Sequence, residues 1–216
     1  MSSSNYIIFD FDGTIADTID LAINIFNGIS YEYDCKPVSE GDRELLRKSR
    51  SSDLLKEYGI SDLKLVRILL RMRKEMSNPA HELKPVIKIP DSLKTIKGQG
   101  FNLGILTSNS VNTVRAFLAC NGLSDMIDFI YSGKSLFGKD KVLERLLDKE
   151  KIPRGNVIYI GDETRDIEAS RKAGVPVIAV TWGLNHRDVL SALDPDQIAD
   201  TPDDILRCVQ QIITDR

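Results

Sequence analysis

Five short apolar runs divide the chain and predict buried β-strands. None alternates cleanly between apolar and polar side chains, as strands covered on only one face do. Helical patterns separate the later runs, and two of those helices close on Gly122 and Gly174, a residue type that often ends helices. The predicted strands are 6–9, 101–106, 128–131, 157–160 and 175–180. This alternation predicts an α/β fold with a doubly wound parallel sheet.

The first predicted strand is isolated, because the next does not begin until Phe101. That gap is too long for one crossover connection. Its residues are almost entirely helical in pattern, with breaks near 34–37, 49–52, 59–61 and 77–79. We therefore expect a helical cap at 17–85, inserted into a core made of 1–16 and 86–216.

Composition narrows the class of protein without identifying it. The 216 residues carry a net charge of -3, with 42% apolar and 28% charged side chains, as in an ordinary globular protein. This balance gives no reason to expect nucleic acid or a membrane as partner, and no apolar run is long enough to span a bilayer. Three scattered cysteines without C-x-x-C spacing argue against disulfides or a zinc site and favour a cytoplasmic location.

The sharpest motif is Asp10-Phe11-Asp12-Gly13-Thr14, directly after the strand 6–9. Period-two geometry places Asp10 and Asp12 on the same side, so two carboxylates converge at the carboxyl end of the strand. Gly13 permits the tight backbone that a bound anion requires. The plain alternative is a turn in which Asp and Thr cap a helix.

Three further polar clusters follow predicted strands or open predicted helices. A lysine at a helix start opposes the helix dipole, so we expect an anionic neighbour there. Acids crowded at a strand end favour a hard cation such as Mg²⁺. Each cluster also has a plain alternative. The hydroxyls of the first would cap a helix, the lysine of the second would be an exposed surface charge, and the acids of the third would be ordinary charges at a helix N-terminus. The clusters are Thr107-Ser108-Asn109-Ser110, Lys139 in Gly138-Lys139-Asp140-Lys141, and Gly161-Asp162-Glu163-Thr164-Arg165-Asp166.

All four motifs stand just past the carboxyl ends of predicted parallel strands, where open α/β sheets bind ligands. In this order the chain resembles the haloacid dehalogenase superfamily, in its phosphoglycolate phosphatase-like branch with a helical cap after the first motif. The resemblance implies a nucleophile at Asp10, a general acid and base at Asp12, phosphate contacts at Thr107, Ser108, Asn109 and Lys139, and Mg²⁺ ligands at Asp10, Asp12 (through its backbone carbonyl), Asp162 and Asp166. Relatives often have Pro-x-Pro after the lysine, which is missing here, so Lys134 and Lys141 remain weaker alternatives to Lys139.

The implied reaction is Mg²⁺-dependent hydrolysis of a small phosphate monoester through an aspartyl-phosphate, with a phosphoglycolate-like ester as the first guess. The acid at Asp12 favours phosphate chemistry over dehalogenation, because a halide leaves without a proton. A sugar phosphomutase is the alternative within the family, and a non-catalytic regulatory or binding protein is the alternative outside catalysis. We expect a monomer or homodimer whose partner is the small-molecule ester.

The predicted cap is locally basic. Ten Lys or Arg stand against six acids between Asp42 and Met76, which gives +4 there and leaves -7 on the remainder. A break between helices holds Arg47, Lys48 and Arg50, where the resembling family places its specificity loop. We hypothesise that one of these three side chains contacts an anionic leaving group when the cap closes. The alternative is an exposed basic turn.

Overall fold

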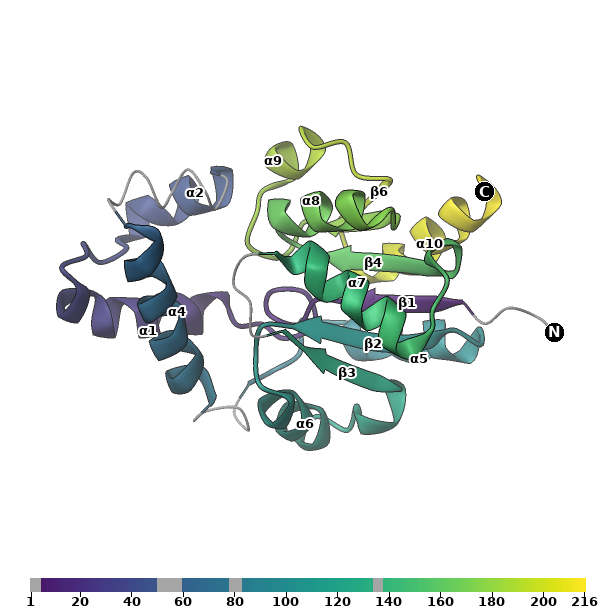
Figure 1. The fold of residues 1–216 in the computed structure, drawn as a ribbon, viewed down its shortest axis with the longest axis horizontal. Coiled ribbons are helices and arrows are strands. Elements are labelled where there is room, and N and C mark those ends of the chain that lie inside the picture. Colours follow the sequence, from purple (N-terminus) through teal and green to yellow (C-terminus); the bar gives the residue numbers. More distant parts are fainter. Residues whose placement is uncertain (1–4, 50–59, 78–82, 134–137) are drawn as a thin grey trace.

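The computed structural model describes residues 5–49, 60–77, 83–133 and 138–216. Figure 1 shows two parts, an open sheet with helices on both faces and a group of helices that lies beyond one end of the strands. The arrowheads of β1, β2 and β3 point toward that group, so the carboxyl ends of these strands face the inserted helices.

Six parallel strands form one sheet in the order β3-β2-β1-β4-β5-β6. The five predicted strands are confirmed, with ends shifted by up to two residues. The sixth, β6, was not predicted. The bounds are β1 Tyr6–Phe9, β2 Asn102–Thr107, β3 Phe129–Ser132, β4 Val157–Gly161, β5 Val177–Val180 and β6 Gln197–Ala199.

Both faces of this sheet are buried, which explains why its strands lack alternation. In β1, Ile7 and Phe9 pack into one apolar cluster while Ile8 packs into another on the opposite face. The same division holds in β4, where Ile158 belongs to the first cluster and Tyr159 to the second. A polar side chain on either face would be buried, so the strands appear in the sequence as continuous apolar runs.

Helices from both sides supply the rest of these clusters. One face is covered by α5 Ile89–Gly98, α6 Val111–Cys120 and α10 Ile205–Thr214. The other is covered by α7 Lys139–Glu150, α8 Thr164–Ala173 and α9 Arg187–Ser191. Short 3₁₀ turns complete the core at η2 Ser124–Met126, η3 Arg154–Asn156 and η4 Pro202–Asp204. The doubly wound α/β prediction is therefore confirmed.

The long gap after β1 is helical, as the sequence predicts. It contains α1 Ile19–Ile29, η1 Ser30–Tyr33, α2 Glu40–Lys48 and α4 Asp62–Ser77. Ile29, Cys35 and Ile68 form a small apolar cluster of their own between α1 and α4. The proposed division at 17–85 stays a prediction.

The chain leaves and re-enters the core through two adjacent segments. Asp17 N donates to Lys84 O at 3.0 Å, and Val86 N donates to Ile15 O at 2.9 Å. These bonds hold the two ends of the insertion together beside the end of β1. Within the described ranges, no helix has the length and apolar character needed to cross a bilayer.

Candidate active site

Three buried carboxylates meet at the carboxyl edge of the sheet. Asp10 follows β1, Asp162 follows β4, and Asp166 lies in the first turn of α8. One oxygen from each lies within 4.8 Å of the others. This close grouping of hard oxygen atoms fits a divalent cation, because buried like charges repel one another strongly without one.

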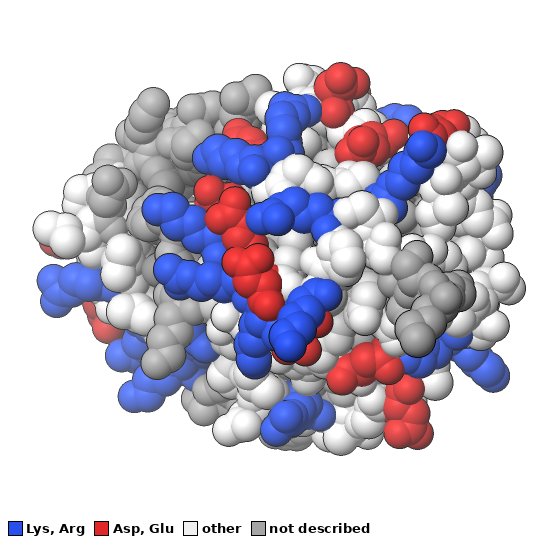
Figure 2. All heavy atoms as spheres, turned by 45° about the vertical axis from the view of Figure 1, so that its right-hand side comes forward, with Lys and Arg blue, Asp and Glu red and all other residues white. Residues whose placement is uncertain are grey.

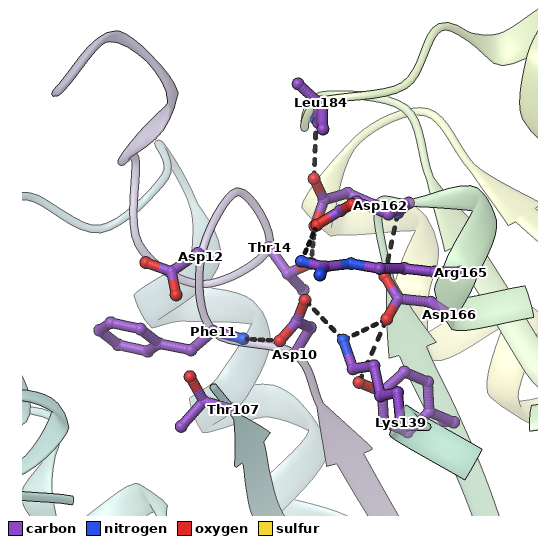
Figure 3. A network of polar contacts seen from close by, with 12 residues as sticks. Asp10, Phe11, Asp12, Thr14, Thr107, Lys139, Asp162, Arg165, Asp166 and Leu184 are labelled. Atoms are coloured by element: carbon purple, nitrogen blue, oxygen red, sulfur yellow. Dashed lines mark hydrogen bonds and ion pairs between the residues drawn. The ribbon is translucent and has the colours of Figure 1, made fainter. Parts of the chain in front are cut away.

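Lys139 opens α7 and lies against two of these acids (Figure 3). Its Nζ is 2.9 Å from Asp10 Oδ2 and also forms an ion pair with Asp166. The ring of Tyr159 lies beneath the same ammonium group, with its centroid 5.4 Å away. The anionic neighbour expected for a lysine at this helix start is therefore present. Lys141 is exposed on α7, and Lys134 lies outside the described residues.

Burial dominates the electrostatics of the cluster. It raises the pKa of Asp10 from 3.8 to about 7, although Lys139 opposes that change. Burial, followed by the nearby carboxylates, raises the pKa of Asp162 well above its ordinary value. Burial by itself would lower the pKa of Lys139, but Asp10 and Asp166 raise it well above 10.5. The lysine therefore remains charged, whereas Asp10 and Asp162 resist ionisation without a further cation.

Two glycines allow the backbone to approach Asp162 closely. Gly13 has a φ of +76°, and a Cβ there would stand 2.4 Å from Asp162 Oδ2. A Cβ at Gly183 would stand 2.2 Å from the same oxygen. Thr14 Oγ1 and Leu184 N each donate to the Asp162 carboxylate at 2.7 Å. The turn after β1 and the loop after β5 thus hold this acid in place.

The Asp12 carboxylate lies apart from the three-acid cluster (Figure 3). Asn109 Nδ2 donates to both of its oxygens, at 3.1 and 3.2 Å. Burial raises the pKa of Asp12, and the bond from Asn109 opposes that rise. Asn109, predicted to contact substrate, is 4% exposed and is positioned to orient Asp12. A carboxyl group with a raised pKa is suited to holding a proton for transfer.

A pocket brings Asp10 and Asp12 together with three other predicted residues. Thr107, Ser108 and Lys139 line it. The full lining is Asp10, Asp12, Leu106, Thr107, Ser108, Gly133, Lys139, Val142 and Arg165. Residues from the ends of β1 and β2 and from the start of α7 therefore converge on one space, as their position after parallel strands predicts.

Sequence reasoning missed three polar contributors to this region. Arg165, from the first turn of α8, lines the pocket beside Asp10. Tyr159 OH donates to Asp166 at 3.4 Å from the middle of β4. Asn185 is fully buried, accepts from Thr164 N at 2.9 Å and donates to Ser49 O at 3.0 Å. Arg165 could have been identified from its place inside the acid-rich motif, whereas nothing in the local sequence distinguishes Tyr159 or Asn185.

Of the predicted basic residues of the insertion, Arg47 contacts the core, and neither Arg47 nor Lys48 lines the pocket. Arg47 Nη2 donates to Thr181 O at 3.5 Å, and Arg47 O accepts from His186 N at 2.7 Å. Lys48 pairs with Glu44 at 3.2 Å. Figure 2 likewise shows basic and acidic side chains interleaved on the face that it draws. Arg50 lies outside the described residues, so contact of these side chains with substrate stays a prediction.

Known proteins match this chain in sequence. The family model for haloacid dehalogenase-like hydrolases matches residues 7–180. A phosphoglycolate phosphatase from Synechococcus elongatus is 35% identical over 96% of this chain and 98% of its own length. The pyrophosphatase PpaX from Bacillus mycoides is 23% identical, over 96% and 98% of the two chains.

Solved structures agree on the fold. A protein described as a predicted phosphatase from Clostridium acetobutylicum superimposes with a TM-score of 0.82 at 20% identity, over 97% of this chain and all of the other. The chain therefore belongs to the haloacid dehalogenase-like hydrolase family and is similar within it to the phosphoglycolate phosphatases.

Proposed function

We propose that this protein is a Mg²⁺-dependent phosphatase that hydrolyses a small phosphate monoester, with Asp10 as nucleophile. The observation that carries the proposal is the placement of two carboxylates with different surroundings in one pocket. Asp10 pairs with the cation of Lys139, while Asp12 is held apart by Asn109. Two acids with separate environments are suited to separate roles, one as nucleophile and one as proton donor.

In the first half of the reaction, an Asp10 oxygen attacks phosphorus and the bond to the leaving oxygen breaks. Asp12 gives its proton to that oxygen, so the alcohol leaves neutral. Thr107 and Lys139 line the same pocket and would bind the non-bridging phosphoryl oxygens. Phe11 N, 2.8 Å from Asp10 Oδ1, fixes the nucleophile in orientation.

In the second half, water attacks the phosphorus of the aspartyl-phosphate. Asp12, now ionised, accepts a proton from that water, and the bond between phosphorus and the Asp10 oxygen breaks. Inorganic phosphate is released, and both carboxyl groups return to their starting states. Ser108 lines the pocket beside Thr107 and offers a further hydroxyl to the phosphate.

The cluster of Asp10, Asp162 and Asp166 fits a divalent cation, and Mg²⁺ is the ion we propose. Its donors are carboxylate oxygens, which Mg²⁺ prefers, and Mg²⁺ sites commonly use only one or two such groups directly. The Asp12 carboxylate accepts from Asn109 instead, and the family resemblance adds the Asp12 backbone carbonyl as a further proposed ligand. When bound, the ion would reduce the repulsion between the Asp10 carboxylate and the phosphoryl oxygens.

The relatives guide the choice of substrate. The 35% identical protein from Synechococcus elongatus is a phosphoglycolate phosphatase, so phosphoglycolate is the first ester to test. The match to a pyrophosphatase shows that similar chains differ in substrate, because one fold supports several specificities. One of the three basic residues Arg47, Lys48 and Arg50 is the proposed contact for the carboxylate of such an ester.

Phosphate release from a panel of esters and pyrophosphate, with and without Mg²⁺, tests the proposal. We expect the highest kcat/KM for a small anionic ester, dependence on Mg²⁺, and loss of turnover in Asp10→Asn. Release that is unchanged in Asp10→Asn would refute the assigned nucleophile. Phosphate transfer to an added hexose phosphate would instead indicate a phosphomutase, and absence of turnover on every ester would indicate a binding protein.

The cytoplasmic location also remains a proposal. Cys35, Cys120 and Cys208 all lie within the described ranges, and none of them forms a disulfide there. Reduced thiols agree with a cytoplasmic protein. Cys35 and Cys208 are buried, so packing accounts for both.

A further inference from the structure

Arg165 lines the pocket that contains Asp10 and Asp12. Within the part of the chain that the structure describes, it and Lys139 are the only cationic side chains in that lining. None of the four motifs assigns it a role. It projects from the first turn of α8, between the two acids Asp162 and Asp166 in the sequence.

The guanidinium of Arg165 has one nitrogen bonded to a carboxylate and another without a partner among the described residues. Its Nη2 donates to Glu163 Oε1. Its Nε is buried and has no hydrogen-bond partner among the residues that the structure covers. The side chain as a whole is 40% exposed. Figure 3 shows the guanidinium reaching across the site to end beside Thr14, close to Asp10.

Lys139 already balances the charge of two carboxylates, so it cannot by itself also balance the charge of a bound phosphoryl group. Its Nζ already pairs with Asp10 and Asp166. A phosphoryl group brings about two negative charges into this space, next to acids whose burial already opposes ionisation. Arginine carries five N–H donors in a planar fork that matches the spacing of phosphoryl oxygens. Glu163 accepts from Nη2 of this fork.

We propose that Arg165 is a substrate-binding residue whose guanidinium binds the phosphoryl oxygens of the ester, with Glu163 as the residue that positions it. This inference rests on the proposed phosphatase function and adds a phosphate contact from α8 to those from β2 and α7. The phosphoryl group would then be bound from three sides of Asp10. Arginine is suited to this position because a charged, forked donor is stronger and more directional than a neutral one.

The competing explanation is that Arg165 only balances the charge of the acidic cluster. The two explanations differ in which ligand responds to its removal. A charge-balancing arginine repels a divalent cation, so its loss would strengthen Mg²⁺ binding and leave phosphate binding no weaker than in a control variant of equal charge. A phosphate-binding arginine takes part in the phosphate complex, so its loss weakens phosphate binding specifically.

The test is calorimetric titration of inorganic phosphate into the Mg²⁺-loaded protein, and of Mg²⁺ alone, for wild type and Arg165→Gln. Lys172→Gln is the matched control, because Lys172 is exposed on the same helix and loses the same charge. We expect Arg165→Gln to raise the Kd for phosphate about 10-fold or more, as loss of hydrogen bonds to a charged group implies, and Lys172→Gln to change it less than about 2-fold.

Arg165→Lys keeps the charge and removes the fork, and it separates the two explanations if Arg165→Gln does not fold. We expect its Kd for phosphate to rise about 3-fold or more. Glu163→Gln should weaken phosphate binding in the same direction and by less than Arg165→Gln. A phosphate Kd in Arg165→Gln equal to that of Lys172→Gln, or a wild-type Kd in Arg165→Lys, overturns the proposal. Failure of the wild-type protein to bind phosphate would count against the proposed function instead.

Discussion

Asp10→Asn should stabilise the metal-free protein even though it removes the nucleophile. The carboxylate of Asp10 is 4% exposed and lies within 4.8 Å of oxygens from Asp162 and Asp166. Ionising it in this place is unfavourable, because the cost of burial exceeds the attraction of Lys139. An asparagine of the same shape avoids that cost, and Lys139 keeps Asp166 as a partner.

The raised pKa of Asp10 sets the size and the pH dependence of the effect. A change from 3.8 to about 7 corresponds to about 4 kcal/mol that opposes ionisation in the folded state. The attraction of Lys139 is already contained in this pKa. Relaxation of the site around the buried charge reduces the figure, so we expect a gain of about 1 to 3 kcal/mol.

Proton linkage gives the direction in which the stability difference between Asp10→Asn and wild type changes with pH. Between about pH 4 and 7 the folded protein holds a proton on Asp10 that the unfolded chain has released, so this group makes the wild type less stable as pH rises. The advantage of asparagine is therefore small near pH 4 and complete above about pH 7.

Thermal and urea unfolding in the presence of a chelator, at pH 5 and pH 8, measure this difference. We expect Asp10→Asn to melt about 2 to 10 °C above wild type at pH 8, with a smaller difference at pH 5. Asp148→Asn, an exposed acid on α7, is the control and should be neutral at both values. A variant that is less stable than wild type at pH 8, or a gain that does not depend on pH, would refute the reasoning.

Three further substitutions test separate parts of the site. Gly13→Ala forces a side chain into a φ of +76° and a Cβ to 2.4 Å from Asp162 Oδ2, so urea unfolding should show a loss of about 2 kcal/mol or more, with weaker Mg²⁺ binding by calorimetry; wild-type values for both would contradict it. Lys139→Met leaves Asp10 without its cation, so the protein should lose about 3 kcal/mol at pH 8 and less at pH 5, where Asp10 is protonated. An equal loss at the two pH values would argue against this pairing. Asn185→Ala removes the bridge between the core and the insertion, so kcat/KM should fall mainly through a higher KM, and a fall through kcat alone would disprove that role.

The strands could be predicted where an apolar run ends on a polar residue. The strand Tyr6–Phe9 was predicted without error, because Asp10 follows it at once. The predicted start of β5 was two residues early, since Val175 follows the end of α8 and its N–H donates to Ser170 O in that helix. The strand β6 has three residues at the sheet edge, only one of them buried, which is too little pattern to detect.

The part of the candidate site that could be predicted is the placement of its residues along the backbone. Parallel strands end at one edge of a sheet, so Asp10, Asp162 and Lys139 come together whatever their rotamers. Side-chain direction could not be derived in the same way. The chain turns after Phe9, so period-two geometry no longer applies at Asp12, and its carboxylate bonds to Asn109 outside the acid cluster.

Trapping the aspartyl-phosphate on Asp10 is the most direct test of the proposed nucleophile. Wild-type protein is mixed with Mg²⁺ and phosphoglycolate, quenched in acid within the first turnover, digested and examined by mass spectrometry. We expect a phosphorylated peptide that contains Asp10, that is absent from Asp10→Asn and that disappears as inorganic phosphate is released. Phosphate release at the wild-type rate with no phosphorylated Asp10 peptide at any quench time would contradict it.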